Sequence, residues 1–368
     1  MHYTRQDGCR AWLTYALWAP ERLQDLLHDF GDAEVVYDRF INEGTVILEP
    51  YATPQQLAVL KKQAQPDAMH RMMLDMHRES IGIMGMEDFG YPDSLRDIPS
   101  PPPLLFYRGD PDCLMGRCVT IVGSRSASPG AIAATEQIAR ELSEHGVTIV
   151  SGLAMGVDSA AHRGCLAGGS PTVGVMAGGL DIDYPAQNRQ LKEDIVRSGG
   201  LLLSEYPLGT PAFARHFPVR NRIMSGLSKA VVLMEARIRS GSMTTVQHAL
   251  DQGREVFAYP GNIGSAWAEG THQLLREGAN YFTGAQDVLE DLGWDDAPPA
   301  PTKAQKQELP PLSPEQRLIL TQLAQGEKSF DQLAEATGLD APALSSGLTM
   351  LQILGLVQSL PGKIYVRA

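Results

Sequence analysis

The sequence has 368 residues, of which 43% are hydrophobic and 20% charged, and its formal net charge is −12. The length suggests two or three domains of about 150 residues each, and the composition is that of a folded globular protein rather than a disordered or membrane protein. No run approaches the roughly 20 apolar residues of a membrane span. The segment Met1 to Trp18 lacks the order of a secretory signal, so we expect a cytoplasmic protein without a membrane span.

The negative net charge argues against a protein that coats nucleic acid with its whole surface, because phosphate binding depends on positive charge. The charge is unevenly distributed, however. Thr210 to Val246 contains six basic residues and one acid, a net +5, so the other residues sum to −17. Such segregation predicts a local anion-binding groove on a protein whose remaining surface is negatively charged and repels nucleic acid. The four cysteines show no metal-binding spacing, so we expect reduced structural thiols and no metal site.

In chain order, residues 1–80 have the mixed polar and apolar spacing of short helices, such as Ala11 to Trp18 and Pro54 to Gln63. We expect a small helical domain of the SAM or helix-hairpin-helix type there. Residues 81–295 instead alternate short β-branched runs, glycine turns and helical segments. Continuous apolar strands separated by helices predict an α/β fold, an extended Rossmann-like domain with a parallel sheet covered on both faces. The expected strands are Cys118 to Val122, Thr148 to Ser151, Thr172 to Met176, Leu201 to Ser204, Ala230 to Met234 and Glu255 to Tyr259.

Residues 296–312 are rich in proline and predict an exposed, semi-rigid linker. The remaining residues, 313–368, begin with Ser313 and Gln316, the spacing of a helix capping box. A helix, a tight turn, the helix Ala341 to Leu354 and a two-stranded wing then predict a winged-helix domain. Its expected recognition helix contains no Lys or Arg, which favours a protein contact over reading of the DNA major groove.

Glycine-rich turns follow successive strands of the expected sheet. After the first strand come Gly123, Ser124 and Arg125, where free backbone N–H groups at a helix start form a natural phosphate site. The GxGxxG fingerprint is absent, and the second strand ends in Ser151 rather than in an acid that could hold a ribose. We therefore expect no NAD and no other cofactor. Gly152 begins the turn after the second strand.

Two polar residues on the following helix, Asp158 and His162, lie four apart and so share one helical face. No nucleophile has a clear place beside them. We interpret them as structural hydrogen-bonding groups rather than as a general acid and base.

The basic segment beyond the fourth strand interleaves cationic, aromatic and amide side chains. That combination suits single-stranded nucleic acid, because guanidinium groups neutralise phosphates while an aromatic ring stacks on a base. A hydroxyl-rich helix start after the fifth strand offers a further phosphate site. The candidate binding residues of these two segments are Arg215, Phe217, Arg220, Asn221 and Arg222 in the first and Ser240, Gly241 and Ser242 in the second.

Seven motifs occur in a fixed order between Tyr91 and Gly284. They are Val122-Gly123-Ser124-Arg125, Ser151 to Asp158 with His162, Gly178-Gly179-Leu180-Asp181 with Tyr184-Pro185, Ser204-Glu205, Phe217 to Arg222, Ser240-Gly241-Ser242 with Thr245, and Pro260-Gly261. This ordered set resembles the DNA-processing protein A family, DprA or Smf, of bacterial natural transformation.

The resemblance implies a Rossmann-like domain that binds single-stranded DNA, forms a homodimer, protects incoming strands from nucleases and helps load the RecA recombinase for homologous recombination. It places Arg125, the segment Phe217 to Arg222 and the turn Ser240 to Ser242 in the DNA pocket. Where some members have a lysine, this chain has Arg215 or His216. The implied protein is not an enzyme.

Two alternatives belong to other functional classes. A phosphoribohydrolase-like enzyme acting on a nucleotide also holds phosphates on glycine turns, but it needs a catalytic glutamate, and only Glu205 and Glu235 lie near strand ends. A winged-helix regulator with an α/β sensor domain predicts a preference for a defined duplex, which the uncharged recognition helix does not favour.

Overall fold

The structure is a computed structural model that describes residues 3–88, 90–262, 264–295, 313–323, 328–353, 357–360 and 364–367. The chain divides into two compact units, Met1–Ala300 and Pro301–Ala368. The expected linker at 296–312 and the tip of the expected wing, Pro361 and Gly362, lie outside the described residues.

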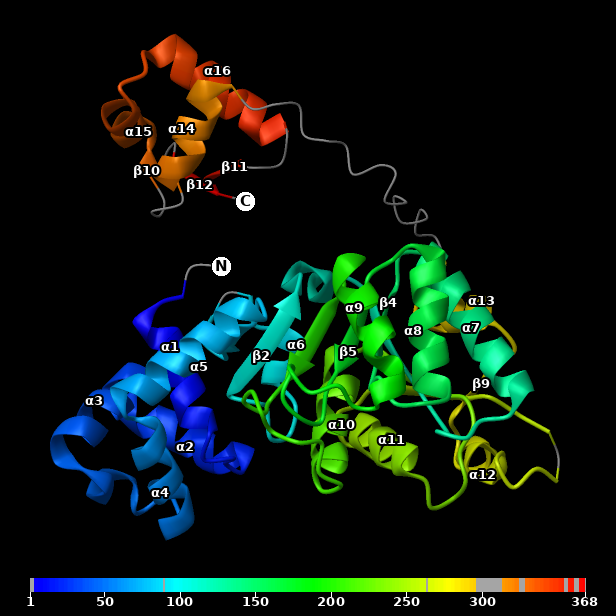
Figure 1. The fold of residues 1–368 in the computed structure, drawn as a ribbon. Coiled ribbons are helices and arrows are strands. Elements are labelled where there is room, and N and C mark those ends of the chain that lie inside the picture. Colours follow the sequence, from blue (N-terminus) through cyan, green and yellow to red (C-terminus); the bar gives the residue numbers. More distant parts are fainter. Residues whose placement is uncertain are drawn as a thin grey trace. The chain divides into compact units, whose positions relative to one another are not determined.

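The first unit is built on a nine-stranded sheet in the order β1-β2-β6-β5-β4-β3-β7-β8-β9 (Figure 1). Strands β3 to β9 run parallel, whereas β2 pairs antiparallel with β1 and with β6. The strands are β1 (Gly82–Gly85), β2 (Leu104–Gly109), β3 (Cys118–Val122), β4 (Thr148–Ser151), β5 (Thr172–Val175), β6 (Leu201–Ser204), β7 (Ala230–Leu233), β8 (Glu255–Ala258) and β9 (Asn280–Tyr281).

The predicted α/β class with a Rossmann-like sheet is confirmed. Strands β3, β4 and β6 have the predicted bounds, and β5, β7 and β8 each end one residue earlier than predicted. Buried parallel strands consist of unbroken apolar runs, which is why the sequence marks them clearly. The strands β1, β2 and β9 were not predicted. The strand β1 is the glycine-flanked tetrapeptide Gly82–Gly85, and β9 has only two residues.

Helices cover both faces of this sheet (Figure 1). On one face, α7, α8 and α13 pack over a core that includes Ile138, Val157 and Val288. On the other face, α6, α10, α11 and α12 pack over a core that includes Ile223 and Val246. The helices that follow β1 in this unit are α6 (Asp93–Arg96), α7 (Pro129–Glu144), α8 (Val157–Gly168), α9 (Arg189–Arg197), α10 (His216–Leu227), α11 (Gly241–Asp251), α12 (Glu269–Arg276) and α13 (Ala285–Asp291), with the 3₁₀ turns Pro111–Met115 and Ala186–Asn188.

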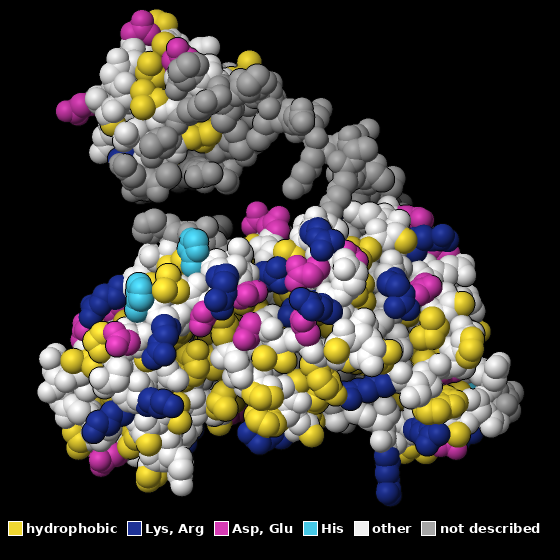
Figure 2. All heavy atoms as spheres, in the orientation of Figure 1, with side chains coloured by type: hydrophobic (Ala, Val, Ile, Leu, Met, Phe, Trp, Pro, Cys, Tyr) yellow, Lys and Arg dark blue, Asp and Glu magenta, His cyan; other side chains and the backbone are white. Residues whose placement is uncertain are grey.

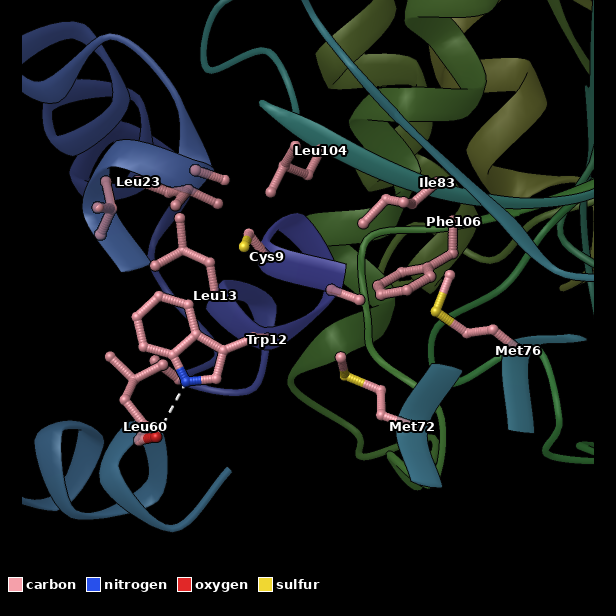
Figure 3. Close-up of a cluster of buried hydrophobic side chains, with 14 of the residues drawn as sticks. Cys9, Trp12, Leu13, Leu23, Leu60, Met72, Met76, Ile83, Leu104 and Phe106 are labelled. Carbon is pink, nitrogen blue, oxygen red and sulfur yellow. Dashed lines mark hydrogen bonds between the residues drawn. The ribbon is translucent and has the colours of Figure 1, made fainter. Parts of the chain in front are cut away.

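The front of the chain forms the helices α1 (Arg5–Thr14), α2 (Pro20–Phe30), α3 (Ala33–Glu43), α4 (Pro54–Gln63) and α5 (Pro66–Arg78), with a 3₁₀ turn at Thr45–Leu48. The predicted helix Pro54 to Gln63 is confirmed, whereas the helix predicted at Ala11 to Trp18 begins at Arg5 and ends at Thr14. Figure 3 shows their core, in which Trp12 Nε1 donates a hydrogen bond to the Leu60 carbonyl oxygen at 2.9 Å. This core continues onto the sheet through Leu104 and Phe106 of β2. The buried Arg10 guanidinium, paired with Glu87 and Asp88, links α1 to the turn after β1.

The second unit contains α14 (Pro314–Leu323), α15 (Phe330–Thr337) and α16 (Ala341–Ile353) and a three-stranded sheet in the order β10-β12-β11. These strands are β10 (Lys328–Ser329), β11 (Val357–Leu360) and β12 (Ile364–Arg367). Ser313 and Gln316 form the reciprocal hydrogen bonds of the predicted capping box. Two antiparallel strands after the last helix form the wing, so the predicted winged helix is confirmed.

All four cysteines are buried and unpaired, as predicted. None of the helices in the described part of the chain combines the length and apolar character that a membrane span needs. On the face drawn in Figure 2, Lys and Arg side chains lie among Asp and Glu side chains, so this face carries no large patch of one sign.

Candidate nucleic-acid pocket

The strand order of the sheet reverses between β3 and β7. Strands β4, β5 and β6 extend the sheet on one side of β3, and β7, β8 and β9 extend it on the other. The loops after β3 and β7 therefore diverge and leave a crevice at the carboxyl edge of the sheet, which is where open α/β sheets bind ligands.

A pocket with a volume of about 310 Å³ lies at this crevice. That volume falls at the lower end of the range for small-molecule sites and suits a ligand the size of one nucleotide. Five segments line it: the end of β3 with the turn after it, the turn after β4, the start of α8, one face of α10 and the start of α11. The lining residues are Val122 to Ser126, Ala154, Asp158, Phe217, Arg220, Asn221, Met224, Ser240 to Ser242 and Thr245.

Two guanidinium groups approach the ring of Phe217. The Arg125 Cζ atom lies 4.7 Å from the ring centroid and the Arg220 Cζ atom 6.0 Å from it. Both distances are within the range of cation–π interactions. Arg125 is exposed and makes no ion pair with any described residue, so its charge is available to a phosphate.

Arg220 is the deeply placed cation of the pocket. Its side chain donates hydrogen bonds to the Val175 carbonyl oxygen and to Asn221 Oδ1. Burial lowers the pKa of Arg220 to about 10, although the nearby Asp158 carboxylate opposes this shift. The group therefore stays charged at neutral pH, and a desolvated cation at this depth attracts an anionic ligand more strongly than a solvated one.

Gly152 explains how Arg220 reaches its position. A Cβ atom on Gly152 would lie 2.4 Å from both terminal nitrogens of Arg220, so only glycine allows the guanidinium to rest against the backbone there. The next residue, Leu153, has φ +56° in the left-handed region, a strained conformation for a leucine. Asn188 Nδ2 holds this turn by donating to the carbonyl oxygens of Leu153 and Ala154 at 2.7 and 3.1 Å.

Asp158 brings a carboxylate into the pocket. Its Oδ2 atom accepts hydrogen bonds from the backbone N–H groups of Gly152 and Ala154 at 3.2 and 3.4 Å. Burial raises the pKa of Asp158, and Arg220 and Arg125 partly oppose that shift. As interpreted from sequence, Asp158 and His162 have structural hydrogen bonds, but not with each other, since His162 Nδ1 bonds to Thr172 Oγ1 at 2.7 Å.

The start of α11 forms the opposite wall. Ser240 caps this helix by accepting a hydrogen bond from the Ser242 N–H group. Asn221 joins the wall to α10, because its Nδ2 atom donates to the Gly241 carbonyl oxygen and to Thr244 Oγ1. The positive end of the α11 dipole thus faces the pocket, which favours an anion there.

Comparison with known proteins identifies the family. The profile of the family "DNA recombination-mediator protein A" matches residues 82–293, more than half of the chain, and this range contains every residue that lines the pocket. The chain belongs to this family. A second profile, for the DprA winged helix domain, matches residues 298–363.

Relatives of the family support this assignment. The chain is 36% identical to Protein Smf of Synechocystis over 76% of this chain and 79% of that protein, and 37% identical to Protein Smf of Escherichia coli over 75% of each. It is 43% identical to the DNA processing protein DprA of Streptococcus pneumoniae over 55% of this chain and 71% of that protein.

Two solved structures of family members resemble the chain. DNA processing protein A from Streptococcus pneumoniae superposes with a TM-score of 0.65 at 33% identity, covering 79% of this chain and 99% of that one. A structure of the Helicobacter pylori protein, described for its single-stranded DNA binding mode, gives a TM-score of 0.53 at 31% identity, covering 58% of this chain and 96% of that one.

The pocket of this family member brings together most of the residues selected from sequence. Three of the selected residues do not line it. Gly152 lies beneath Arg220, beside a small adjoining pocket. Arg215 is exposed, with its Cζ atom 4.7 Å from the Phe213 ring centroid. The selected residues in the lining are Gly123, Ser124, Arg125, Phe217, Arg220, Asn221, Ser240, Gly241 and Ser242.

The third, Arg222, faces the other way. The pocket takes Phe217, Arg220 and Met224 from α10, at the i, i+3 and i+7 spacing of one helical face. Arg222 follows Arg220 by two residues, about 200° around the helix. Its guanidinium forms a bidentate, buried ion pair with Glu205 at 2.6 and 2.7 Å. Sequence spacing alone did not reveal this because the segment was not recognised as helical.

Asp158 and Thr245 are pocket residues that the sequence did not mark as such. Asp158 follows the glycine turn after β4. The sequence signal that could have marked it is an acidic residue beside a turn whose backbone N–H groups could bind phosphate. Thr245 Oγ1 is buried and lacks a hydrogen-bond partner among the described residues.

The two glutamates that the enzyme alternative requires have structural partners. Glu205 is paired with Arg222. Glu235 accepts hydrogen bonds from the Ser128 N–H and Oγ–H groups at the start of α7, at 2.9 and 2.7 Å. Neither of these glutamates is among the residues that line the pocket.

Proposed function

We propose that this family member binds single-stranded DNA in the pocket between β3 and β7. The observation that carries the proposal is the proximity of the Phe217 ring to an exposed cation, Arg125, and to a buried one, Arg220. An aromatic face that stacks on a base, beside cationic side chains, is how proteins hold single strands without reading their sequence.

Further observations support this function. The pocket is about the size of one nucleotide, and the start of α11 faces it. More exposed arginines without an ion pair among the described residues, Arg237 and Arg239, precede this helix. The family relative from Helicobacter pylori is described as binding single-stranded DNA.

The family resemblance supplies the rest of the proposal. We propose that this cytoplasmic protein acts without catalysis as a homodimer in natural transformation, where it protects the incoming strand and helps load RecA. The division into residues 1–80, 81–295, 296–312 and 313–368 also stays a prediction. The winged helix is proposed to contact protein, because α16 contains no Lys or Arg.

A binding measurement tests the central proposal. A labelled oligonucleotide, single-stranded or duplex, is titrated with the full-length protein across a salt series. We expect preferential and salt-sensitive binding to the single strand. Arg125→Ala should weaken that binding and reduce the dependence of log K on log salt by about 0.7, the value for one lost phosphate contact on a single strand.

Arg140→Ala is the matched control, because Arg140 is an exposed arginine of α7 that does not line the pocket. It should leave affinity and salt dependence unchanged. Equal affinity for duplex and single strand, or equal effects of the two substitutions, would remove the pocket from DNA binding. RecA loading is tested separately, by following RecA filament growth on the strand with wild-type protein and with Arg125→Ala, which should lose the stimulation.

A further inference from the structure

Asp158 and Arg220 are charged groups of the pocket, and each has one hydrogen-bonding atom without a partner in the described part of the chain. Asp158 Oδ2 is occupied by two backbone N–H groups, but Oδ1 has no partner in the described part of the chain. Arg220 uses Nε and Nη1, whereas Nη2 has no described partner. Neither free atom is among the fully buried atoms that lack a partner, and both residues line the pocket although they are only 5% and 3% exposed.

The acceptor and the donor lie side by side at Gly152. The Asp158 carboxylate accepts from the Gly152 N–H group, and the Arg220 guanidinium rests against the Gly152 Cα atom. Despite opposite charges, they form no ion pair with each other among the described contacts. Buried charges usually pair when they can, so this arrangement leaves one carboxylate oxygen and one guanidinium N–H group without a partner in the lining of the pocket.

The carboxylate limits which part of a nucleotide can lie there. A phosphate is repelled by it, because like charges at short range are costly. Inside a DNA strand the deoxyribose has no hydroxyl group, so it cannot donate a hydrogen bond to Oδ1. The remaining donors of the nucleotide are the N–H groups of the base, and those on the Watson–Crick edge are free only when the base is unpaired.

We propose that Asp158 and Arg220 together bind the Watson–Crick edge of one unpaired base. Every base offers an N–H donor beside an acceptor on this edge: N6–H and N1 in adenine, N4–H and N3 in cytosine, N1–H and O6 in guanine, N3–H and O4 in thymine. One acceptor and one donor therefore fit all four. The inference rests on the proposed function and adds that the pocket excludes duplex DNA chemically, without preferring a sequence.

Thymine gives a direct test, because N3 carries its one N–H group and a methyl group there blocks it. We would measure the affinity of the full-length protein for oligo-dT and for the same strand with N3-methylthymine. Backbone charge and stacking area are retained in this pair. We expect about tenfold weaker binding of the methylated strand, the loss expected for a hydrogen bond to a charged acceptor.

The variant Asp158→Asn separates hydrogen bonding from a steric clash. Its amide oxygen can still accept from Gly152 and Ala154, so the turn is retained, but an NH₂ donor replaces the free oxygen. We expect this variant to bind both strands with similar affinity. A ratio measured on one preparation is unaffected by any misfolded fraction. Asp181→Asn, the same change in the turn after β5 where the carboxylate holds the Gly209 N–H group, should keep the tenfold ratio.

The outcomes distinguish this inference from the proposed function. If wild-type protein fails to bind oligo-dT, the proposed function is wrong. If it binds oligo-dT and the methylated strand equally, single-stranded binding stands but the edge contact is wrong. A tenfold ratio that persists in Asp158→Asn would show that the methyl group clashes with another part of the pocket and would also overturn the inference.

Discussion

Replacing Arg222 by methionine tests whether this side chain binds DNA or stabilises the fold. Its position in the sequence alone does not distinguish these two roles. Motif position suggested a phosphate contact, whereas the structure pairs the side chain with Glu205 on the face of α10 turned away from the pocket. We therefore expect Arg222→Met to lose stability and to keep its affinity for single-stranded DNA to within about twofold, a difference of less than about 0.5 kcal/mol.

The size of the stability loss follows from the burial of the pair. The Arg222 and Glu205 side chains are only 5% and 12% exposed. Removing one partner of a buried ion pair costs about 3–5 kcal/mol, because the other charge is left without compensation. Arg222 also donates to the carbonyl oxygens of Ser100 and Val219. With a urea m-value near 3 kcal/mol/M, the unfolding midpoint should fall by about 1 to 2 M.

The assay is urea unfolding followed by intrinsic fluorescence, with DNA affinity measured in the absence of urea. The double variant Glu205→Leu with Arg222→Met is the informative control, since it removes both buried charges. It should recover at least half of the lost stability, because an apolar pair of similar volume often replaces a buried ion pair at little cost. Native stability of Arg222→Met together with tenfold weaker DNA binding would refute the reasoning.

Three further predictions concern the pocket and its support. Phe217→Ala should weaken single-strand binding about tenfold or more, since stacking contributes ~1–3 kcal/mol per base; an unchanged affinity would exclude stacking on this ring. Gly152→Ala should also weaken binding, with circular dichroism showing a folded protein, because its Cβ atom displaces the Arg220 guanidinium. Burial lowers the pKa of His162 to about 3, so below its ordinary value of 6.5 the unfolded chain takes up a proton that the folded chain does not. Stability should thus fall by about 1.4 kcal/mol per pH unit as the pH drops from 6.5 toward 4, and His162→Gln should lack this component in urea titrations at each pH.

The sequence was informative wherever one local pattern determines the structure. The core strands could be placed to within one residue because each is an apolar run between glycine turns. The strand β2, which lies between the edge strand β1 and β6, was missed because it is antiparallel to both neighbours and a proline-rich passage precedes it. Within the pocket, Arg125 and Phe217 were identified from composition. Placing Arg222 required the helical phase of α10, and recognising Asp158 required knowing which of its two oxygens the backbone already uses.

The shared core of the front helices and the sheet has a consequence for how members of this family can differ in length. Ile83, Leu104 and Phe106 are buried in one cluster with side chains of those helices, such as Cys9, Met72 and Met76. A relative that lacks the front helices would expose these positions to water, and exposed apolar patches promote aggregation. We therefore expect shorter members to carry polar side chains at the equivalents of these three positions, so that loss of the helices and loss of the apolar surface occur together.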